Sequence, residues 1–442
     1  MLHSAAMLQE GQSVRLVRHG EDVEVGPLLG EGGEGVVFAA QRHRLAIKWY
    51  HPGSATPLKR AGIEYLLDIG RPHHRFVWPE DIVEAGTGAG RHGPGADAGF
   101  GYVMPLLPPG YVEMSAIRQG QAPGLVKSAQ MGFELADAFL RVHSLGLCYR
   151  DINFRNILFH PDDGHILICD NDNIGIDGSR GGVYGVEWFM APEMIIRLLD
   201  KAWETHPSRR TDLHSLAVLL FELLMGGHPL DGLRSDDYDT FDRPERMDLF
   251  GPRALFVYDP DDRANAPIPG FHQNVIDNWP VYPQFIRDLF TEAFTVGLRD
   301  PDARVPESVW RKAMVRLAGA GVPCSRCARE NFYGGPTTCW SCGGTIRYPP
   351  RLVIGDLELA LNSHTTVRSY HLDLDYDRDA TCAAMTANPR DPEVWGLQNL
   401  SDTTWVAEHP TAGTRPIQPG RTIALAAGLI IDFGPTTGKV EP

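Results

Sequence analysis

Three polar side chains near the middle of the sequence could bind a metal ion and act on a hydroxyl group. Asp151 stands five residues before Asn156, and Asp170 follows two short apolar runs that predict a β-hairpin. Carboxylate and amide oxygens suit magnesium, which is a hard cation. We therefore expect Asn156 and Asp170 to hold the metal, and Asp151 to orient or deprotonate an acceptor hydroxyl. The alternative, a loop whose acids and amides only cap turns, does not explain the order of these elements.

A glycine-rich segment and a lysine in the N-terminal part could bind phosphate groups. Glycines let the backbone approach a phosphate without a Cβ clash, and their N–H groups can surround an anion. Lys48 ends the following strand, shortly after Ala46, and can reach the α and β phosphates of a nucleotide. Glu64 on the next predicted helix is its expected ion-pair partner, although Glu64 could also lie on a solvated helix face. The other positions expected at the nucleotide are Gly30, Gly32, Gly33, Gly35 and Val37.

Four of the seven cysteines form two close pairs, which predict a metal site. Cys324 and Cys327 make the first pair, and Cys339 and Cys342 make the second, with eleven residues between the pairs. Each pair can supply two thiolates from one tight turn, and two such turns complete a tetrahedral zinc site. Four cysteine ligands leave no open coordination position, so one structural Zn²⁺ is expected. A redox dithiol is the alternative, but a single pair would suit it better. The remaining cysteines are predicted to be buried free thiols.

The hydrophobic pattern divides the chain into a strand-rich part, a helical part and a strand-rich tail. Short alternating runs over residues 12–50 predict antiparallel hairpins, and strand-like runs also occur at 76–83 and 101–107. After residue 109 helical spacing dominates, and residues 231–270 look like a polar surface excursion. From residue 350 onward only alternating runs remain. The predicted helices cover residues 57–69, 124–145, 211–225, 281–296 and 308–317.

Composition limits the classes of function. A chain of 442 residues with 43% hydrophobic and 22% charged residues suits two or three globular domains. The formal net charge of −15 argues against binding nucleic acid or an anionic membrane. The N-terminus has no secretory pattern, and the most apolar helix candidate is too short to cross a bilayer. We therefore expect a cytoplasmic protein.

Taken together, residues 20–318 resemble the protein kinase family. The resemblance rests on the glycine-rich segment, Lys48, the run from Tyr149 to Asn156, and Asp170. Residues 185–193 resemble the end of an activation segment. The resemblance implies ATP, Mg²⁺ (or Mn²⁺) and a protein substrate. It also implies that residues 102–107 form the strand that leads to the hinge between the lobes, with Met104 at the gatekeeper position and with the Pro105 carbonyl and the Leu107 N–H group bonding to adenine.

Several residues depart from the family pattern. Tyr149 replaces the usual histidine, and Asn153 stands where Ser/Thr kinases keep a lysine for the γ-phosphate. The run 170–173 reads Asp-Asn-Asp-Asn in place of Asp-Phe-Gly. Asp170 is the expected metal ligand because it continues the phase of the preceding strand, and Asp172 could be a second ligand. These departures imply that catalysis could be slow.

Finer motifs are similar to a bacterial kinase-like group found in tellurite-resistance-type gene clusters. They lie at residues 149–153, 169–173, 228–232, 249–251 and 256–260. This resemblance implies a von Willebrand A-domain protein and a metal-dependent protein phosphatase as partners.

The tail resembles a degenerate forkhead-associated β-sandwich. The resemblance lies at residues 352–355, 399–405, 417–420 and 430–434. Asp356 stands where true members carry an arginine, and the run from Ser369 to His371 matches the phosphothreonine-binding core poorly. A surface for a protein partner is therefore expected, and phosphothreonine binding is not.

The sequence thus predicts an α+β chain with a bilobal protein-kinase-like fold, a zinc ribbon and a β-sandwich tail. The expected domains are a kinase N-lobe at 1–107, a C-lobe at 108–320, the ribbon at 321–348 and the tail at 349–442. The expected reaction is transfer of the ATP γ-phosphoryl group to a Ser or Thr of a protein. A pseudokinase that only assembles the phosphatase and the von Willebrand A protein is the alternative, and a small-molecule kinase is a third option.

Overall fold

The computed structural model describes residues 8–40, 44–85, 99–179, 185–201 and 206–442. They form two compact units, each assembled from several stretches of the chain. The first unit comprises Met1–Ala116, Ala138–Met190 and Arg197–Ser215, and the second comprises Ile117–Asp137, Ala191–Ile196 and Leu216–Pro442. Helices α2 (Leu125–Ser144) and α4 (Arg209–Met225) each contribute residues to both units.

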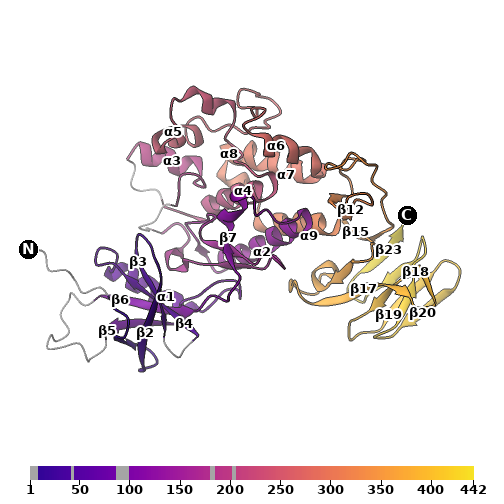
Figure 1. The fold of residues 1–442 in the computed structure, drawn as a ribbon, viewed down its shortest axis with the longest axis horizontal. Helices are drawn as coiled ribbons and strands as arrows, with labels where there is room; N and C mark the ends of the chain where they lie inside the picture. The colour runs from indigo at the N-terminus through magenta and orange to yellow at the C-terminus, as the bar shows by residue number, and fades with distance from the viewer. Residues whose placement is uncertain (1–7, 41–43, 86–98, 180–184, 202–205) are drawn as a thin grey trace, which may run out of the picture. The chain divides into compact units, whose positions relative to one another are not determined.

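A closed antiparallel barrel forms the N-terminal part of the first unit (Figure 1). Its core is aliphatic and aromatic, with Val14, Val25, Ile47 and Val83 fully buried. Helix α1 (Pro57–Ile69) begins where the Thr56 side chain accepts a hydrogen bond from the Lys59 N–H group, with a proline in its first turn. The strands, in barrel order, are β1 (Ser13–Leu16), β2 (Asp22–Glu31), β3 (Gly35–Ala40), β4 (Leu45–Tyr50), β6 (Phe100–Pro105) and β5 (Asp81–Ala85).

Short strands in the rest of the first unit carry the loops of the candidate site. The antiparallel pair β9 (Ile157–Phe159) and β10 (Ile166–Ile168) aligns Ile157 with Ile168. The Cys169 N–H group then donates to the Asn156 carbonyl at 2.8 Å, so the loop before β9 and the loop after β10 lie together. The other short elements are β7 (Val112–Glu113), β8 (Leu147–Cys148), β11 (Gly175–Ile176) and the 3-10 helices Met114–Gln119 and Asn171–Asn173.

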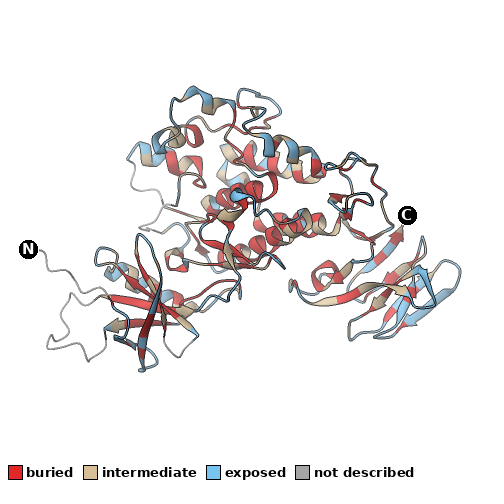
Figure 2. Cartoon of the chain, in the orientation of Figure 1, coloured by how far each residue is buried: buried red, intermediate tan, exposed pale blue. Residues whose placement is uncertain are grey.

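Helices dominate the first part of the second unit. Phe221 on α4 packs against Phe256, Phe290 and Phe294, with ring centroids 5.1–5.8 Å apart. Figure 2 shows buried residues along α4 and the helices that pack against it. Among the described residues, no helix is both long and apolar enough to span a membrane. The remaining helices are α3 (Pro192–Leu199), α5 (Arg243–Phe250), α6 (Gln273–Asn278), α7 (Gln284–Phe294), α8 (Val296–Arg299) and α9 (Glu307–Gly319), with 3-10 turns at Leu233–Asp237, Trp279–Val281 and Pro301–Ala303.

Two antiparallel sheets share one apolar core in the C-terminal part of the second unit. Trp405, Leu352, Leu397 and Ile431 lie in that core and are almost completely buried. The first sheet has the order β15-β14-β23-β22-β19-β20, and the second has the order β16-β17-β18-β21. A small hairpin of β12 (Gly321–Pro323) and β13 (Glu330–Phe332) precedes them.

The first sheet contains β14 (Arg351–Ile354), β15 (Leu357–Ala360), β19 (Trp405–His409), β20 (Gly413–Ile417), β22 (Ile430–Asp432) and β23 (Thr437–Glu441). The second contains β16 (Thr366–Arg368), β17 (Thr381–Asn388), β18 (Asp391–Asn399) and β21 (Thr422–Ala424), and a 3-10 helix, Ser369–Leu372, follows β16.

Two expectations about local structure are wrong. Residues 76–83 do not form one strand, because Pro79 interrupts the run: Phe76 makes an isolated bridge to Ile168, and β5 starts only at Asp81. Residues 231–270 are not simply a surface excursion. They contain helix α5, and Phe256 is completely buried among the aromatic rings around Phe221.

Candidate functional site

A buried carboxylate, Asp172, lies at the centre of the candidate site in the first unit. Lys48 on β4 donates to Asp172 Oδ1 and to Asp170 Oδ1, both at 3.0 Å. Tyr50 Oη donates to Asp172 Oδ2 at 2.5 Å, and Lys59 Nζ lies 3.3 Å from the same oxygen. The Asp172 side chain is fully buried, whereas that of Asp170 is 51% exposed. The two acids of this loop therefore differ: one is enclosed by cations and the other faces solvent.

The charges in this cluster determine its protonation. Burial opposes ionisation of Asp172, but the charges of Lys48 and Lys59 and the hydrogen bond from Tyr50 outweigh it and hold the Asp172 pKa well below its usual range. Burial likewise opposes the ammonium form of Lys48, yet neighbouring groups, Asp172 and Asp170 among them, raise the pKa of Lys48. Lysine and carboxylate are thus both charged at neutral pH.

Asp151 is held by two amides in the loop between β8 and β9. Asn153 Nδ2 donates to Asp151 Oδ1 at 2.9 Å, and Asn156 Nδ2 donates to Asp151 Oδ2 at 3.0 Å. Burial raises the pKa of Asp151, the two amide hydrogen bonds lower it, and the nearby charge of Asp170 raises it, with a net upward shift. Because the Asn156 nitrogen is bonded to Asp151, its carbonyl oxygen is the atom that could face a cation.

The backbone of this loop is anchored by helix α4. Asp212 accepts hydrogen bonds from the N–H groups of Tyr149 and Arg150, and from His143 Nε2. Arg150 has φ +76°, a conformation that costs free energy for a non-glycine residue and needs such support. Tyr149 Oη donates to the Cys169 carbonyl, which ties the loop to the segment after β10. The aromatic ring that replaces the expected histidine therefore has a structural role.

The expected ion pair between Lys48 and Glu64 is absent in this structure. The Glu64 side chain is 48% exposed and bonds to Arg60 at 3.1 Å. Its position explains the difference: Lys59, Ile63 and Leu66 share one face of α1, and Ile63 and Leu66 are fully buried. Glu64, one residue beyond Ile63, is rotated away from that face. Lys59, and not Glu64, points from α1 toward the site.

The glycine-rich residues lie in β2, in β3 and in the turn between them. Gly30 pairs with Val37 across the two strands, and the Gly32 N–H group donates to the Gly35 carbonyl at 2.9 Å. Gly33 lies in the same turn. A Cβ on Gly35 would come within 2.3 Å of the Trp49 carbonyl oxygen, so the close approach of β3 to β4 requires glycine there.

The other expected nucleotide contacts lie on the same barrel. Val37 pairs with Lys48, and Ala46 pairs with Met104. Pro105 ends β6 and pairs with Leu45, and Leu107 is exposed two residues later. The barrel therefore presents the glycine-rich turn, the lysine and the expected hinge from neighbouring strands.

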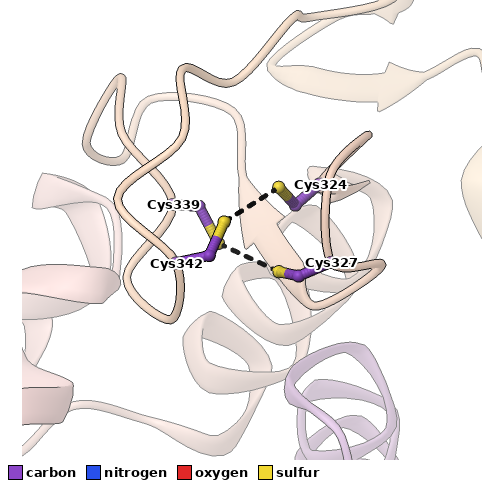
Figure 3. Close-up of side chains that lie close together, drawn as sticks. All are labelled: Cys324, Cys327, Cys339 and Cys342. Carbon is purple, nitrogen blue, oxygen red and sulfur yellow. Dashed lines mark hydrogen bonds between the residues drawn. The ribbon is translucent and has the colours of Figure 1, made fainter.

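The four paired cysteines come together in the second unit (Figure 3). Their sulfur atoms all lie within 4.8 Å of one another, with Cys324 Sγ 3.7 Å from Cys342 Sγ and Cys327 Sγ 3.6 Å from Cys339 Sγ. Sulfurs bound about 2.3 Å from a zinc ion lie roughly 3.8 Å apart in a tetrahedron, whereas disulfide sulfurs are about 2.05 Å apart. The spacing therefore fits a four-thiolate zinc site.

The two cysteine turns have matching backbones. The Ala328 N–H group donates to the Cys324 carbonyl, and the Gly343 N–H group donates to the Cys339 carbonyl, both at 2.9 Å. Ala328 and Gly343 both have positive φ. Burial opposes the Cys339 thiolate, but the N–H groups of Cys342 and of Ser341 lower the pKa of this thiol to about 6. The thiolate, the form that binds metal, is thus favoured at Cys339.

Residues 116–257 match the protein kinase domain family. This stretch of the chain is similar to a protein kinase domain. Such a domain implies a two-lobed fold of mixed α and β structure, as well as ATP and magnesium.

Several similar curated proteins are named as kinases. Human "Ribosomal protein S6 kinase alpha-2" is 33% identical over 155 residues, which are 32% of this chain and 20% of that kinase. The "Putative ribosomal protein S6 kinase alpha-1" of Caenorhabditis elegans is 37% identical over 148 residues, 30% of this chain and 18% of that protein. "Serine/threonine-protein kinase PknG" of Mycolicibacterium smegmatis is 28% identical over 165 residues, 35% of this chain and 19% of that kinase. This chain therefore matches about a fifth of the length of these relatives.

Sequence reasoning missed Lys59 and Tyr50 as members of the site. Lys59 could have been found from its spacing, because it lies four residues before Ile63 and seven before Leu66 on the apolar face. Tyr50 could not, because a strand of apolar and aromatic residues gives no signal for the one hydroxyl that meets a distant acid.

Proposed function

We propose that this kinase domain transfers the γ-phosphoryl group of ATP to a Ser or Thr of a partner protein. The observation that carries the proposal is the loop pair that brings Asp151 and Asn156 beside Asp170, through the backbone bond from Cys169 to Asn156. Those are the groups that such a reaction needs at the acceptor hydroxyl and at the metal. The kinase relatives support the same reaction type.

Each group has a separate role in this proposal. Asp151, fixed by Asn153 and Asn156, would accept the proton of the acceptor hydroxyl; its raised pKa suits a base. The Asn156 oxygen and the half-exposed Asp170 carboxylate would hold Mg²⁺ or Mn²⁺, since oxygen donors fit these cations. The metal, when bound, would neutralise charge on the phosphates. Lys48 and the glycine-rich turn would bind those phosphates, and the hinge would hold adenine.

The remaining parts of the proposal concern organisation and partners. Kinase lobes at 1–107 and 108–320, a zinc ribbon at 321–348 and a forkhead-associated-like tail at 349–442 remain our proposed division. The two shared-core sheets after residue 350 support such a tail. A protein substrate, with a von Willebrand A-domain protein and a metal-dependent phosphatase as partners, follows from the resemblance to the bacterial kinase-like group.

One observation favours the second candidate, a pseudokinase scaffold. Asn153 occupies the position where a phosphate-binding lysine is expected, is buried, and directs its amide to Asp151. A site without that second cation would stabilise the transferred phosphoryl group less well.

Labelled ATP with magnesium separates the two candidates. The Asp151→Asn variant should lose roughly 10²–10⁴-fold in labelling of protein substrate, while its affinity for Mg-ATP stays close to wild type. Equal labelling by both proteins would mean that Asp151 is not the base. Mg-ATP binding without any labelling by wild type would support the scaffold.

We also propose one structural zinc ion at Cys324, Cys327, Cys339 and Cys342. Elemental analysis of protein purified without added metal should give about one equivalent, and Cys339→Ser should release it. Metal-free wild-type protein whose four thiols oxidise readily to disulfides would support the redox alternative.

A further inference from the structure

Lys59 connects three elements of the first unit. Its Nζ donates to Glu34 Oε2 of the glycine-rich turn at 2.9 Å and to Asn173 Oδ1 at 2.7 Å, and it lies 3.3 Å from Asp172 Oδ2. The lysine itself belongs to helix α1, and its side chain is only 14% exposed. One ammonium group thus joins the helix, the turn and the loop after β10.

Both lysines contact the Asp172 carboxylate. Lys48 bonds Oδ1 at 3.0 Å and Oδ2 at 3.1 Å, while Lys59 approaches Oδ2 from helix α1. A buried carboxylate that loses its only cation is left uncompensated, which is strongly destabilising. With Lys59 in place, Asp172 keeps a cation even when Lys48 turns toward another anion.

We propose that Lys59 is the positioning residue that frees Lys48 to bind nucleotide phosphates. It takes the place of the absent pair between Lys48 and Glu64, with the charges reversed: the helix supplies the cation and the loop supplies the acid. Its bond to Glu34 also holds the glycine-rich turn against α1. The inference rests on the proposed binding of ATP by this site, but not on phosphoryl transfer.

If Lys59 frees Lys48 in this way, replacing Lys59 should lower the affinity only for ligands that carry phosphates. Without Lys59, Lys48 is the sole lysine at Asp172 and is retained there, so ligands with phosphates should bind more weakly and adenosine should not. The test is calorimetric titration of the full chain with Mg-ATP, Mg-ADP and adenosine. We expect Lys59→Met to weaken Mg-ATP binding about tenfold, equivalent to about 1.4 kcal/mol, with adenosine affinity unchanged.

Three further variants make the test specific. Lys59→Arg should restore most of the affinity because it keeps the charge. Lys59→Met combined with Asp172→Asn should also recover affinity, because the acid that retains Lys48 is gone. Glu64→Gln is the matched control on the same helix and should bind like wild type, since Glu64 faces Arg60. Circular dichroism of each variant establishes that it is folded.

Several results would overturn the inference. Unchanged Mg-ATP affinity in Lys59→Met would do so, as would an equal loss for adenosine, which would indicate a merely structural role. A larger loss in Glu64→Gln would show that the usual pair assembles when nucleotide binds. If wild type binds no Mg-ATP, both this inference and the proposed function fail. If wild type binds Mg-ATP but transfers no phosphate, only the proposed function fails.

Discussion

Buried acids occur in both units, but the cations that hold them differ. In the first unit, Asp172 is held by two lysines beside the half-exposed Asp170. In the second unit, Glu134 on helix α2 is held by Arg378 of the tail at 3.0 Å. Asp137, one turn further along α2, is held by Arg311 of α9 at 2.6 Å.

The arginine-held acids form a joint between the tail and the helices of the same unit. Arg378 also donates to Gln130, and the Arg311 guanidinium lies 3.4 Å from the ring centroid of Tyr376. The Phe133 and Tyr370 rings pack with centroids 4.8 Å apart. One face of the tail is thus covered by helices α2 and α9, and a protein partner would have to use another face.

The use of lysine in the first unit and of arginine in the second has consequences that follow from the chemistry of the two side chains. A guanidinium is a rigid planar fork that fits carboxylates and stacks on aromatic rings, so its bonds are hard to exchange. An ammonium is a compact charge on a flexible stem, which can turn from one anion to another. An acid shared by two lysines therefore suits a site that exchanges partners, and an acid bound by arginine suits a permanent contact.

The largest expected effect concerns the joint. Arg378→Met should lower the free energy of unfolding of the second unit by about 3–5 kcal/mol, because Glu134 stays buried without this cation. Urea denaturation measures the loss. Adding Glu134→Leu should recover much of it, and Arg415→Met, on the exposed strand β20, is the matched control. If Arg378→Met and Arg415→Met cost the same, the joint is not what holds the tail.

A smaller effect is expected when the lysine cluster is broken. Lys48→Ala should unfold more easily than wild type, but by less than Arg378→Met, because Asp172 keeps Lys59 and Tyr50. The variant should also lose most of the stabilisation by Mg-ATP, which is about 2.7 kcal/mol at a hundred times the Kd. Thermal denaturation with and without Mg-ATP measures both. An unchanged Mg-ATP shift would contradict the phosphate role of Lys48.

The smallest expected effect is a dependence on pH beside the joint. Burial first, and then the charge of Arg368, lower the pKa of His371 to about 3. The unfolded chain binds this proton near pH 6.5, so stability is complete above that pH and falls as pH decreases toward 3. The loss attributable to His371 should be at most about 1.4 kcal/mol per pH unit.

Urea midpoints between pH 7.5 and 5.5 test this expectation. His371→Phe should flatten the slope relative to wild type, because phenylalanine fills the same buried place and takes up no proton. His409→Phe, at a partly exposed histidine on β19, is the matched control. A slope that is identical in wild type and His371→Phe would mean that other groups carry the pH dependence.

Local patterns predicted the secondary structure well where apolar periodicity was strong. Helix α1 has the expected bounds, and α2 lies within a residue of its expected ends. The pairing of side chains was harder to predict. Lys59 shares the face of α1 that Ile63 and Leu66 bury, but its spacing alone does not show that the acid it meets is Asp172.

Contacts between distant residues gave no sequence signal at all. Arg378 lies in an ordinary polar stretch, and its partner Glu134 is 244 residues away on a helix. The cysteine cluster was predictable because four identical ligands at short spacing carry their own geometry. A single ion pair has no such spacing pattern in the sequence.

The three hydrogen bonds to Asp212 also bear on the order in which parts of the first unit open. The amide hydrogens of Tyr149 and Arg150 are donated to a side chain on the first turn of α4, and not to a neighbouring strand. Their exchange with deuterated solvent therefore requires that the helical turn unfolds or that the hydrogen bonds to the Asp212 carboxylate break. The loop that carries Asp151 would then share the protection of a helix more than sixty residues away, and would open with it as one cooperative segment.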